Sequence, residues 1–401
     1  MMLTHRPLAR YKILDLTQAR AGPVAVRQLS DWGADVLMIE SVGRDGAMGG
    51  RDGSDFQNLH RGKRSLSLDL KTDEGREILY RLVADADLLF ENFRPQVKYK
   101  LGVDYETLSA INPRLVYVSI SGFGQSGPYR DRPSVDQIAQ GMGGLMSVTG
   151  LPGQGPVRAG IAVSDCAAGL YGALGAMVAL LDREVTGQGR WVQTSLIESL
   201  IAFSDFQAAR ATVDKVAPAQ AGNDHPTFAP MGLFPTADGA VNIAVLGADM
   251  FDRFCEVADQ EALRTDPRFS SGKARAQNRA ALNLAIKEVV RLRPSAYWVE
   301  ALNAVGVPCG FVYRMDEVFD DPQVRHLELA EGVEHPRRGL INLIGQPISI
   351  SGLDGSLTRC APERGEHTRE VLEEIGLEAA AIDDLVARRI VGAPRSGADG
   401  A

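Results

Sequence analysis

Short apolar runs alternate with amphipathic, charged stretches along the first third of the chain. The apolar runs are rich in Val, Ile and Leu and predict strands, whereas the stretches between them have the pattern of surface helices. Because strands and helices alternate, we expect a parallel sheet that is covered by helices on both faces. Strands are predicted at 12–17, 34–40, 65–70, 88–92 and 116–121, and helices at 23–32 and 72–84.

A glycine-interrupted helical segment at 134–149 leads towards the most apolar part of the chain, Leu170–Leu181. We interpret this stretch as a buried core helix that is capped at its start by Ser164 or Asp165. Its length falls short of the roughly 20 residues that a membrane helix needs. The sequence therefore predicts no membrane span.

Pro, Gly and polar residues at 217–235 break the alternating pattern, and we place a domain boundary there. The sequence FPTADGAVNIAV that follows predicts a hairpin with its turn at Asp238 and Gly239. Helices are expected to dominate the next stretch, and 268–290 predicts the longest of them. The predictions for the rest of the chain are a β-like run at 341–350, a final helix at 366–377 and a frayed tail at 391–401.

The 401 residues include 43 Lys and Arg against 51 Asp and Glu, a formal charge of −8. This acidic balance argues against a nucleic-acid partner, which would require a basic surface. With 45% hydrophobic and 23% charged residues, the composition is that of a globular protein of about two to three domains. The N-terminal segment lacks the continuous apolar run of a signal peptide, so we expect a cytoplasmic location.

Cysteine and histidine spacing excludes the common metal motifs. The four cysteines, Cys166, Cys255, Cys309 and Cys360, lie far apart without CxxC spacing, and we expect them to be reduced thiols. The six histidines form neither HxxxH nor HExxH. We therefore expect no metal site.

Common nucleotide-binding and hydrolase motifs are missing or out of context. GxGxxG occurs at 122–127, but a loop with two prolines at 128–133 follows where a dinucleotide-binding helix would have to start. Glu40 stands where an acid could bind a ribose, which is only half a fingerprint for NAD. Neither GxSxG nor GxxxxGK[ST] occurs, so serine-hydrolase and phosphate-loop mechanisms have no support.

Asp165 is the most informative carboxylate, because it begins an otherwise uncharged apolar helix. As a helix cap it would accept hydrogen bonds from backbone N–H groups, and Ser or Asn could replace it. As a nucleophile or base it could not be replaced without loss of the chemistry. The pattern of residues leaves both roles open.

Basic residues gather loosely in the first third of this acidic chain. Such an excess indicates either a solvated face or a site for an anionic, phosphate-bearing ligand. The residues are Arg61, Lys63, Arg64, Lys71, Arg94, Lys98 and Lys100.

Several long motifs follow one another along residues 9–378, among them ILDLTQARAGPVAVRQLSDWGADVLMIE, LLFENFRP and SDCAAGLYGALGAMVALLDREVTGQGRWVQTSLIES. Through them the chain resembles the family III CoA-transferases, also called the CaiB/BaiF family, which includes formyl-CoA and carnitine CoA-transferases and α-methylacyl-CoA racemases. The resemblance implies an acyl-CoA:carboxylate CoA-transferase. Its substrates would be an acyl-CoA, which brings coenzyme A, and a small carboxylic acid, with no metal.

In transferases of this family an aspartate before the apolar helix is the covalent nucleophile, and the matching residue is Asp165. The resemblance thus implies a mixed anhydride and then an aspartyl-CoA thioester at Asp165. Gln18 matches a family glutamine close to the reacting acyl group, and Asp136 aligns with an acidic residue near the catalytic aspartate. Their purely structural alternatives are a loop-closing hydrogen bond for Gln18 and a helix cap for Asp136.

For coenzyme A the family pattern points to two short segments and one further position. Many family members have arginine at that further position, and the lysine found here keeps the charge but loses the two-pronged hydrogen bonding. The residues are Leu70, Lys71 and Thr72, then Asn92, Phe93 and Arg94, and finally Lys100.

The racemase branch shuttles a proton with a histidine that would fall at Val135, and valine cannot carry a proton. This favours transfer and leaves an acyl-CoA racemase or epimerase as the alternative. The region 221–225 lacks the glycine run of formyl-CoA transferases, so a C4 or C5 dicarboxylic acid is at least as suitable a substrate as formate or oxalate. A CoA-binding protein without turnover and a nicotinamide dehydrogenase are the remaining alternatives.

The resemblance also implies the architecture. We expect an α/β protein with a large Rossmann-like domain, a smaller inserted α+β domain, and two subunits threaded through one another as an interlocked homodimer. The expected boundaries are 1–220 for the N-terminal part of the large domain, 221–325 for the small domain and 326–401 for the return to the large domain.

Overall fold

The computed structural model describes residues 5–43 and 50–392. They divide into two compact units, each assembled from segments that are distant in the sequence. The first unit falls within 1–145, 159–209 and 323–401, and the second comprises 146–158 and 210–322.

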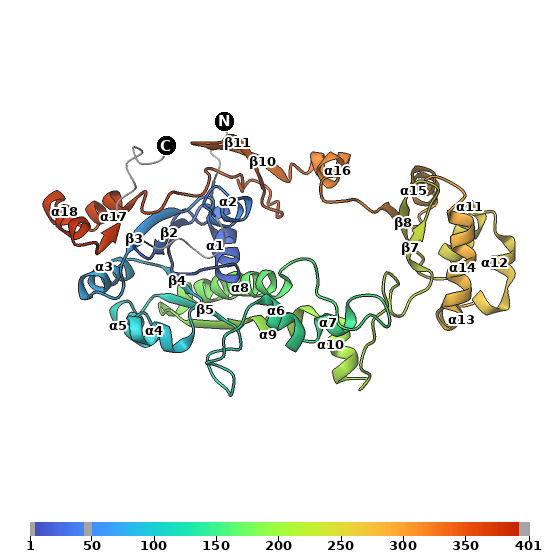
Figure 1. Ribbon diagram of the computed structural model, residues 1–401, viewed down its shortest axis with the longest axis horizontal. Coiled ribbons are helices and arrows are strands. Elements are labelled where there is room, and N and C mark those ends of the chain that lie inside the picture. Colours follow the sequence, from blue (N-terminus) through green and yellow to red (C-terminus); the bar gives the residue numbers. More distant parts are fainter. Residues whose placement is uncertain (1–4, 44–49, 393–401) are drawn as a thin grey trace. The chain divides into compact units, whose positions relative to one another are not determined.

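A single sheet forms the centre of the first unit (Figure 1). In the described residues it has seven strands in the order β12-β3-β2-β1-β4-β5-β6; β1 to β6 are parallel, and β12 is antiparallel to β3 at one edge. The expected parallel sheet is thus confirmed. The strands are β1 (Lys12–Asp15), β2 (Asp35–Glu40), β3 (Arg64–Leu68), β4 (Leu88–Glu91), β5 (Val116–Ser121), β6 (Trp191–Ser195) and β12 (Val391–Gly392).

Two hydrophobic cores lie on opposite faces of this sheet. Side chains alternate between the faces along each strand, so Ile13 enters one core and its neighbour Leu14 the other. This is why these strands read as continuous apolar runs in the sequence. Helices α1 (Ala21–Asp31) and α8 (Val163–Thr186) supply the first core, and α3 (Asp73–Ala84), α5 (Tyr105–Ile111), α17 (Thr368–Glu374) and α18 (Ala379–Ala387) the second.

Shorter elements complete the first unit or lie where the chain passes from one unit to the other. The helices are α2 (Ser54–His60), α4 (Pro95–Leu101), α6 (Asp136–Met142), α7 (Leu145–Val148), α9 (Leu196–Phe203), α10 (Asp205–Thr212) and α16 (Pro322–His326), and the strands of a separate antiparallel pair are β10 (Ala330–His335) and β11 (Gly339–Ile344).

Helix α8 is buried on one face only, which corrects the expectation of a fully buried core helix. Small residues such as Gly169, Gly172 and Ala176 pack inwards, whereas Leu174 and Val178 are exposed. Among the described helices, α8 alone is long and apolar enough to cross a membrane, and half of its most apolar stretch is buried inside the protein. The small inward residues allow α1 to approach closely, so burial follows residue size as well as hydrophobicity.

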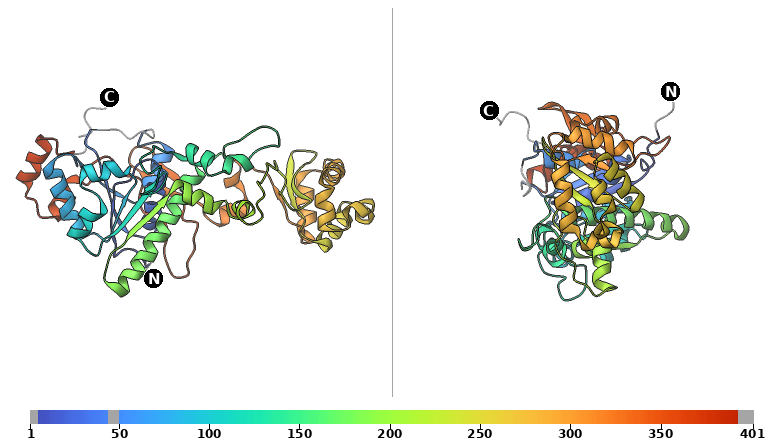
Figure 2. Two further views of the ribbon diagram at one scale, coloured as in Figure 1. Left: turned by 90° about the horizontal axis from the view of Figure 1, so that it is seen from below. Right: turned by 90° about the vertical axis from the view of Figure 1, so that its right-hand side faces the viewer.

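The second unit has a three-stranded antiparallel sheet with helices packed against it, drawn in yellow and orange in Figure 2. The expected hairpin is confirmed, since Pro235 pairs with Ala240 across Asp238 and Gly239. The elements are β7 (Met231–Pro235), β8 (Ala240–Ala244), β9 (Cys309–Phe311), α11 (Ala248–Val257), α12 (Glu261–Thr265), α13 (Gly272–Gln277), α14 (Arg279–Val290) and α15 (Ser295–Ala304), with 3-10 turns at Pro267–Phe269 and Val318–Asp320.

Several expectations are corrected in these later parts of the chain. Residues 146–158 belong to the second unit, because the Gln220 amide donates 2.6 Å hydrogen bonds to the carbonyls of Thr149 and Gly155. The long helix predicted at 268–290 is broken at Asn278, between α13 and α14.

The C-terminal region differs from expectation in a similar way. The strand predicted at 341–350 ends at Ile344. The helix predicted at 366–377 is confirmed as α17 at 368–374, but it is not the final one, because α18 follows at 379–387. Val391 and Gly392, placed in the frayed tail, pair with β3, while 393–401 lie outside the described residues. Pairing with a distant strand, which local composition does not encode, orders this short segment.

Candidate functional site

A small cavity lies where the direction of the sheet topology reverses. From β1 the chain first builds outwards to β2 and β3 and then crosses to β4 on the other side of β1. The loops after β1 and β4 therefore diverge at the carboxyl edge, which is the usual ligand site of such sheets. The cavity has a volume of about 140 Å³ and is lined by Ala19, Arg20, Ala21, Asn92, Phe93, Arg94, Pro95, Ile120, Ser121, Gly122, Arg130, Arg132, Ser134, Val135, Asp165 and Leu196.

Asp165 reaches this cavity from the first turn of α8. The helix begins after Ala162, so Asp165 is its third residue, and neither Asp165 nor Ser164 is the cap that the sequence suggested. The half-buried carboxylate makes no hydrogen bond within the described part of the chain. Burial, reinforced by the negative charge of Asp136 and opposed by Arg20, raises the pKa of Asp165 from 3.8 to about 6.

Asp136 holds the start of α8 in place. One carboxylate oxygen accepts hydrogen bonds from the backbone N–H and the hydroxyl of Ser164, at 3.0 and 2.8 Å. The other accepts a 2.8 Å bond from the amide of the fully buried Gln140, which also bonds the Ile161 carbonyl and the Ala159 N–H. Asp136 is buried and does not line the cavity, so its contacts are those of a positioning residue for Asp165.

Arg20 is a cavity residue that the sequence analysis missed. One of its terminal nitrogens lies 2.8 and 2.7 Å from the two carboxylate oxygens of Asp55 on α2. The residue before it, Ala19, has a φ of 61°, in the left-handed region that is unfavourable for a residue with a Cβ. Such strain is found at functional loops, but neither feature has a local sequence signal.

Gln18 and Asn92 tie the two diverging loops together. The Asn92 side chain accepts a 2.9 Å hydrogen bond from the Gln18 N–H and donates a 2.7 Å bond to the Gln18 carbonyl. Asn92 lines the cavity, whereas the exposed Gln18 does not. The structure thus shows a loop-closing role for the backbone of Gln18.

A buried ion pair supports the loop after β4 from below. The Lys98 ammonium lies 3.1 Å from Glu91, 3.2 Å from the Ser119 hydroxyl and 2.7 Å from the Gln125 side-chain oxygen. Glu91 also accepts a 2.8 Å hydrogen bond from the N–H of Phe93. Lys98 therefore joins the loop after β4 to the loop after β5, and both loops line the cavity.

The residues expected to bind coenzyme A fall into two groups. Asn92, Phe93 and Arg94 line the cavity, whereas the segment 70–72 and Lys100 do not. Within 70–72, the Thr72 hydroxyl caps α3 by accepting a 3.0 Å bond from Gly75, and Leu70 packs against the second core. Exposed lysines stand at positions 71 and 100.

Most basic residues of the loose cluster form ion pairs within the protein. Arg61 and Lys63 are buried and form ion pairs with Asp31 and Asp15, and Lys98 pairs with Glu91 as described. Buried charges need such partners, because desolvation is costly. Sequence composition reveals the charges but not their distant partners, so it left a solvated face and an anion-binding site open.

Comparison with known proteins shows the family of the chain. The model of CoA-transferase family III matches residues 8–368. The chain belongs to CoA-transferase family III.

Curated relatives cover almost the entire chain. A succinyl-CoA–D-citramalate CoA-transferase of Chloroflexus aurantiacus is 33% identical over 96% of this chain and 98% of its own. A succinate–glutarate CoA-transferase of Agrobacterium fabrum is 35% identical over 92% and 96%. A CaiB/BaiF family protein from Brucella suis has a solved structure that matches with a TM-score of 0.82 at 34% identity, covering 92% of this chain and 99% of that one.

The glycine loop 122–127 and Glu40 of the transferase do not form a dinucleotide site. No helix starts directly after the glycine loop 122–127 in the described chain, and the next one, α6, begins at Asp136. Glu40 accepts a 2.7 Å hydrogen bond from Ser65 and is paired with Arg51. The glycine loop therefore does not open a helix as an NAD-binding loop would, and Glu40 already has partners within the protein.

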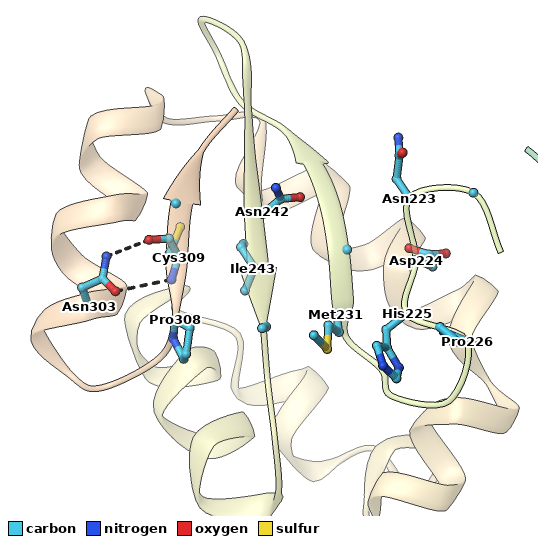
Figure 3. Close-up of a pocket in the computed structure, with 14 residues that line it drawn as sticks. Asn223, Asp224, His225, Pro226, Met231, Asn242, Ile243, Asn303, Pro308 and Cys309 are labelled. Atoms are coloured by element: carbon cyan, nitrogen blue, oxygen red, sulfur yellow. Dashed lines mark hydrogen bonds between the residues drawn. The ribbon is translucent and has the colours of Figure 1, made fainter. Parts of the chain in front are cut away.

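A larger cavity of the transferase, about 550 Å³, lies within the second unit (Figure 3). The loop 222–226 forms one wall and strands β7, β8 and β9 the other, with Asn303 holding the backbone of Cys309 at 2.8 and 3.4 Å. His225 accepts 3.2 Å hydrogen bonds at Nδ1 from the N–H groups of Thr227 and Phe228. None of the catalytic or CoA-binding residues expected from the sequence lines this cavity.

The described residues hold no group of three or more His, Cys, Asp and Glu side chains placed to bind a metal ion. The cysteines at 166, 255, 309 and 360 are free thiols.

Proposed function

We propose that this transferase moves CoA between small carboxylic acids, with Asp165 as the covalent nucleophile. One observation carries the proposal, namely a carboxylate without a hydrogen-bond partner among the described residues, in a cavity at the switch point of the sheet. A structural carboxylate at a helix start would accept hydrogen bonds, as Asp136 does. Asp165 instead bears the cost of burial, which fits a reactive group.

The first half of the reaction exchanges bonds at two carbonyl carbons, that of the donor thioester and that of Asp165. An Asp165 oxygen attacks the thioester carbonyl of the donor acyl-CoA, the C–S bond breaks with its electron pair on sulfur, and a mixed anhydride and CoA thiolate result. The thiolate attacks the Asp165 carbonyl, the anhydride C–O bond breaks, and the donor acid leaves as a carboxylate. Asp165 then carries CoA as a thioester.

The acceptor acid completes the exchange by the same steps in reverse. Its carboxylate attacks the Asp165 thioester, CoA thiolate leaves, and a new mixed anhydride forms. The thiolate attacks the acceptor's carbonyl carbon, which releases the new acyl-CoA and the free Asp165 carboxylate. No proton, metal or oxidant is consumed in the cycle.

The surrounding residues have supporting roles in this proposal. The positive charge of Arg20 stabilises the oxyanions that form at Asp165. Asp136 and Gln140 fix the position of that turn. Asn92, Phe93 and Arg94, together with Leu70, Lys71, Thr72 and Lys100, bind CoA, and Gln18 lies beside the acyl group.

Short dicarboxylic acids are the proposed acyl groups, because the relatives named above act on citramalate, succinate and glutarate by their names. Racemisation lacks its proton carrier: the residue on the cavity wall next to Asp136 is Val135. We further propose that two copies form an interlocked homodimer in the cytoplasm. The exposed apolar face of α8 would be covered in such an assembly.

Intact-protein mass spectrometry after mixing with a panel of acyl-CoAs tests the mechanism. Wild-type protein should gain a CoA adduct that hydroxylamine or borohydride traps at Asp165, and Asp165→Ala should gain none. Asp182→Ala, a change at an exposed carboxylate on the same helix, is the matched control and should keep the adduct. Exchange of the α-proton of the acyl group without any adduct would overturn the proposal in favour of a racemase.

A further inference from the structure

Four arginine side chains line the cavity that contains Asp165, but two of them are already paired. Arg20 is held by Asp55, and the Nε of Arg130 lies 3.2 Å from a carboxylate oxygen of Asp131. The side chains of Arg94 and Arg132 have neither an ion pair nor a hydrogen bond with any residue that the structure describes. The cavity therefore contains positive charge that is not ion-paired, and an anionic ligand would neutralise it.

Arg132 is the better oriented of these two cations. Its guanidinium carbon lies 3.6 Å from the centre of the Tyr129 ring, and Tyr129 meets Phe123 edge-to-face at 5.7 Å. Stacking on an aromatic ring fixes the plane of a guanidinium and leaves its N–H groups free at the edge. Those N–H groups match the two oxygens of a carboxylate.

The position of Arg132 places it near the reacting end of the substrate. In the proposed reaction the CoA sulfur bonds to Asp165, and the pantetheine arm, which is as long as several extended residues, separates that sulfur from the phosphates. The volume of about 140 Å³ is also well below the roughly 300–1,000 Å³ of pockets that enclose a drug-sized ligand. A guanidinium in this cavity therefore lies within reach of the acyl group.

We propose that Arg132 binds the far carboxylate of a dicarboxylic acyl group and so selects dicarboxylic over monocarboxylic substrates. This inference rests on the proposed function, since it assumes that the acyl group is transferred at Asp165. It assigns a role to the loop 128–133, which the sequence analysis treated only as a connection.

The formation of the Asp165 adduct from two four-carbon donors, succinyl-CoA and butyryl-CoA, tests the proposal in a single turnover. Wild-type protein should react faster with succinyl-CoA, and Arg132→Gln should lose this preference by roughly 10- to 100-fold while keeping its rate with butyryl-CoA. Arg132→Lys, which retains charge without the fork, should fall in between. Because Arg132 is exposed, these variants should fold normally.

Variants of neighbouring arginines are the controls. Arg130→Gln changes the same loop and should leave the succinyl/butyryl ratio as in wild type. Arg94→Gln should slow both donors equally, since Arg94 is assigned to CoA. An equal loss with both donors in Arg132→Gln, together with weaker binding of free CoA, would mean that Arg132 contacts a phosphate and would overturn the inference.

Two further results separate this inference from the proposed function. A wild-type protein that forms the adduct without preferring succinyl-CoA, or an Arg132→Gln variant that retains the preference, contradicts only the role of Arg132. The absence of an adduct with any acyl-CoA contradicts the covalent mechanism itself.

Discussion

Asp165 combines two properties that a nucleophilic carboxylate requires. Burial and Asp136 raise its pKa to about 6, so the ionised form is more basic than that of an ordinary aspartate yet still predominates at neutral pH. Its neighbour Asp136 is held by Ser164 and Gln140 and keeps its charge at a fixed place. The charge of Asp136 thus raises the pKa of Asp165, and the hydrogen bonds of Asp136 hold the start of α8.

The activity of the transferase should fall as the pH drops through about 6, because protonation removes the nucleophile. Asp136→Asn removes a negative charge that raises the pKa of Asp165. The acidic limb of the pH–activity profile, along which activity falls, should therefore move to lower pH. Relative activity at pH 5 should then rise about two- to fivefold. The measurement is kcat/KM between pH 5 and 8.

Ser164→Ala is the control for this experiment, because it removes one hydrogen bond of Asp136 but no charge. It should lower activity without moving the limb. An unchanged limb in Asp136→Asn would show that Asp136 does not influence the titration of Asp165.

Helices α1 and α8 pack closely because α8 presents glycines to α1 and the sheet. A Cβ on Gly169 would lie 2.6 Å from a methyl group of Val24 and 2.8 Å from the carbonyl oxygen of Ala21. At Gly172 the nearest atom, at 2.8 Å, is the terminal methyl of Ile120, which can rotate away. The two glycines thus face different degrees of resistance, although both are buried in the same helix.

Gly169→Ala should destabilise the protein by about 1–3 kcal/mol, since backbone of α1 must move to accept the methyl group. Gly172→Ala should be close to neutral, because the gain in helix propensity of about 1 kcal/mol offsets a small side-chain shift. Denaturant unfolding of both variants is the measurement. Equal stabilities would show that the α1–α8 contact is not tightly packed.

The acidic molecule buries a few of its positive charges, and among these Arg61, Lys63 and Lys98 have acidic partners. The surface of the molecule includes an exposed apolar stripe on α8. The exposed residues on this face are Leu170, Leu174, Val178, Leu181 and Val185. Such a contiguous stripe is typical of a surface that is covered in an assembly.

Val178→Glu should weaken self-association of the transferase by at least about tenfold, because a charge would have to be buried at the contact. Leu284→Glu on α14 is the matched control, since Leu284 is 63% exposed and Val178 is 58% exposed. Size-exclusion chromatography with light scattering over a dilution series measures the effect. A monomeric wild-type protein, or equal association of both variants, would contradict the proposed homodimer.

The sequence indicates the strands, the parallel sheet and the hairpin, because the alternation of apolar and polar residues is a local property that reports which side of an element is buried. Its family motifs also single out Asp165. They also name Gln18 and Asp136. In the structure the backbone of Gln18 bonds the Asn92 side chain, and the contacts of Asp136 include Gln140 and Ser164.

Contacts between distant residues account for what the pattern could not supply. The partners of Lys63 and Lys98 and the pairing of Arg20 with Asp55 arise only when separate elements pack together. The sequence shows directly which residues are apolar or charged. The energy of a buried charge or of a packed helix depends on its neighbours in space. For that reason the strands of the parallel sheet follow from the sequence, whereas the surroundings of Asp165 follow from how the elements pack.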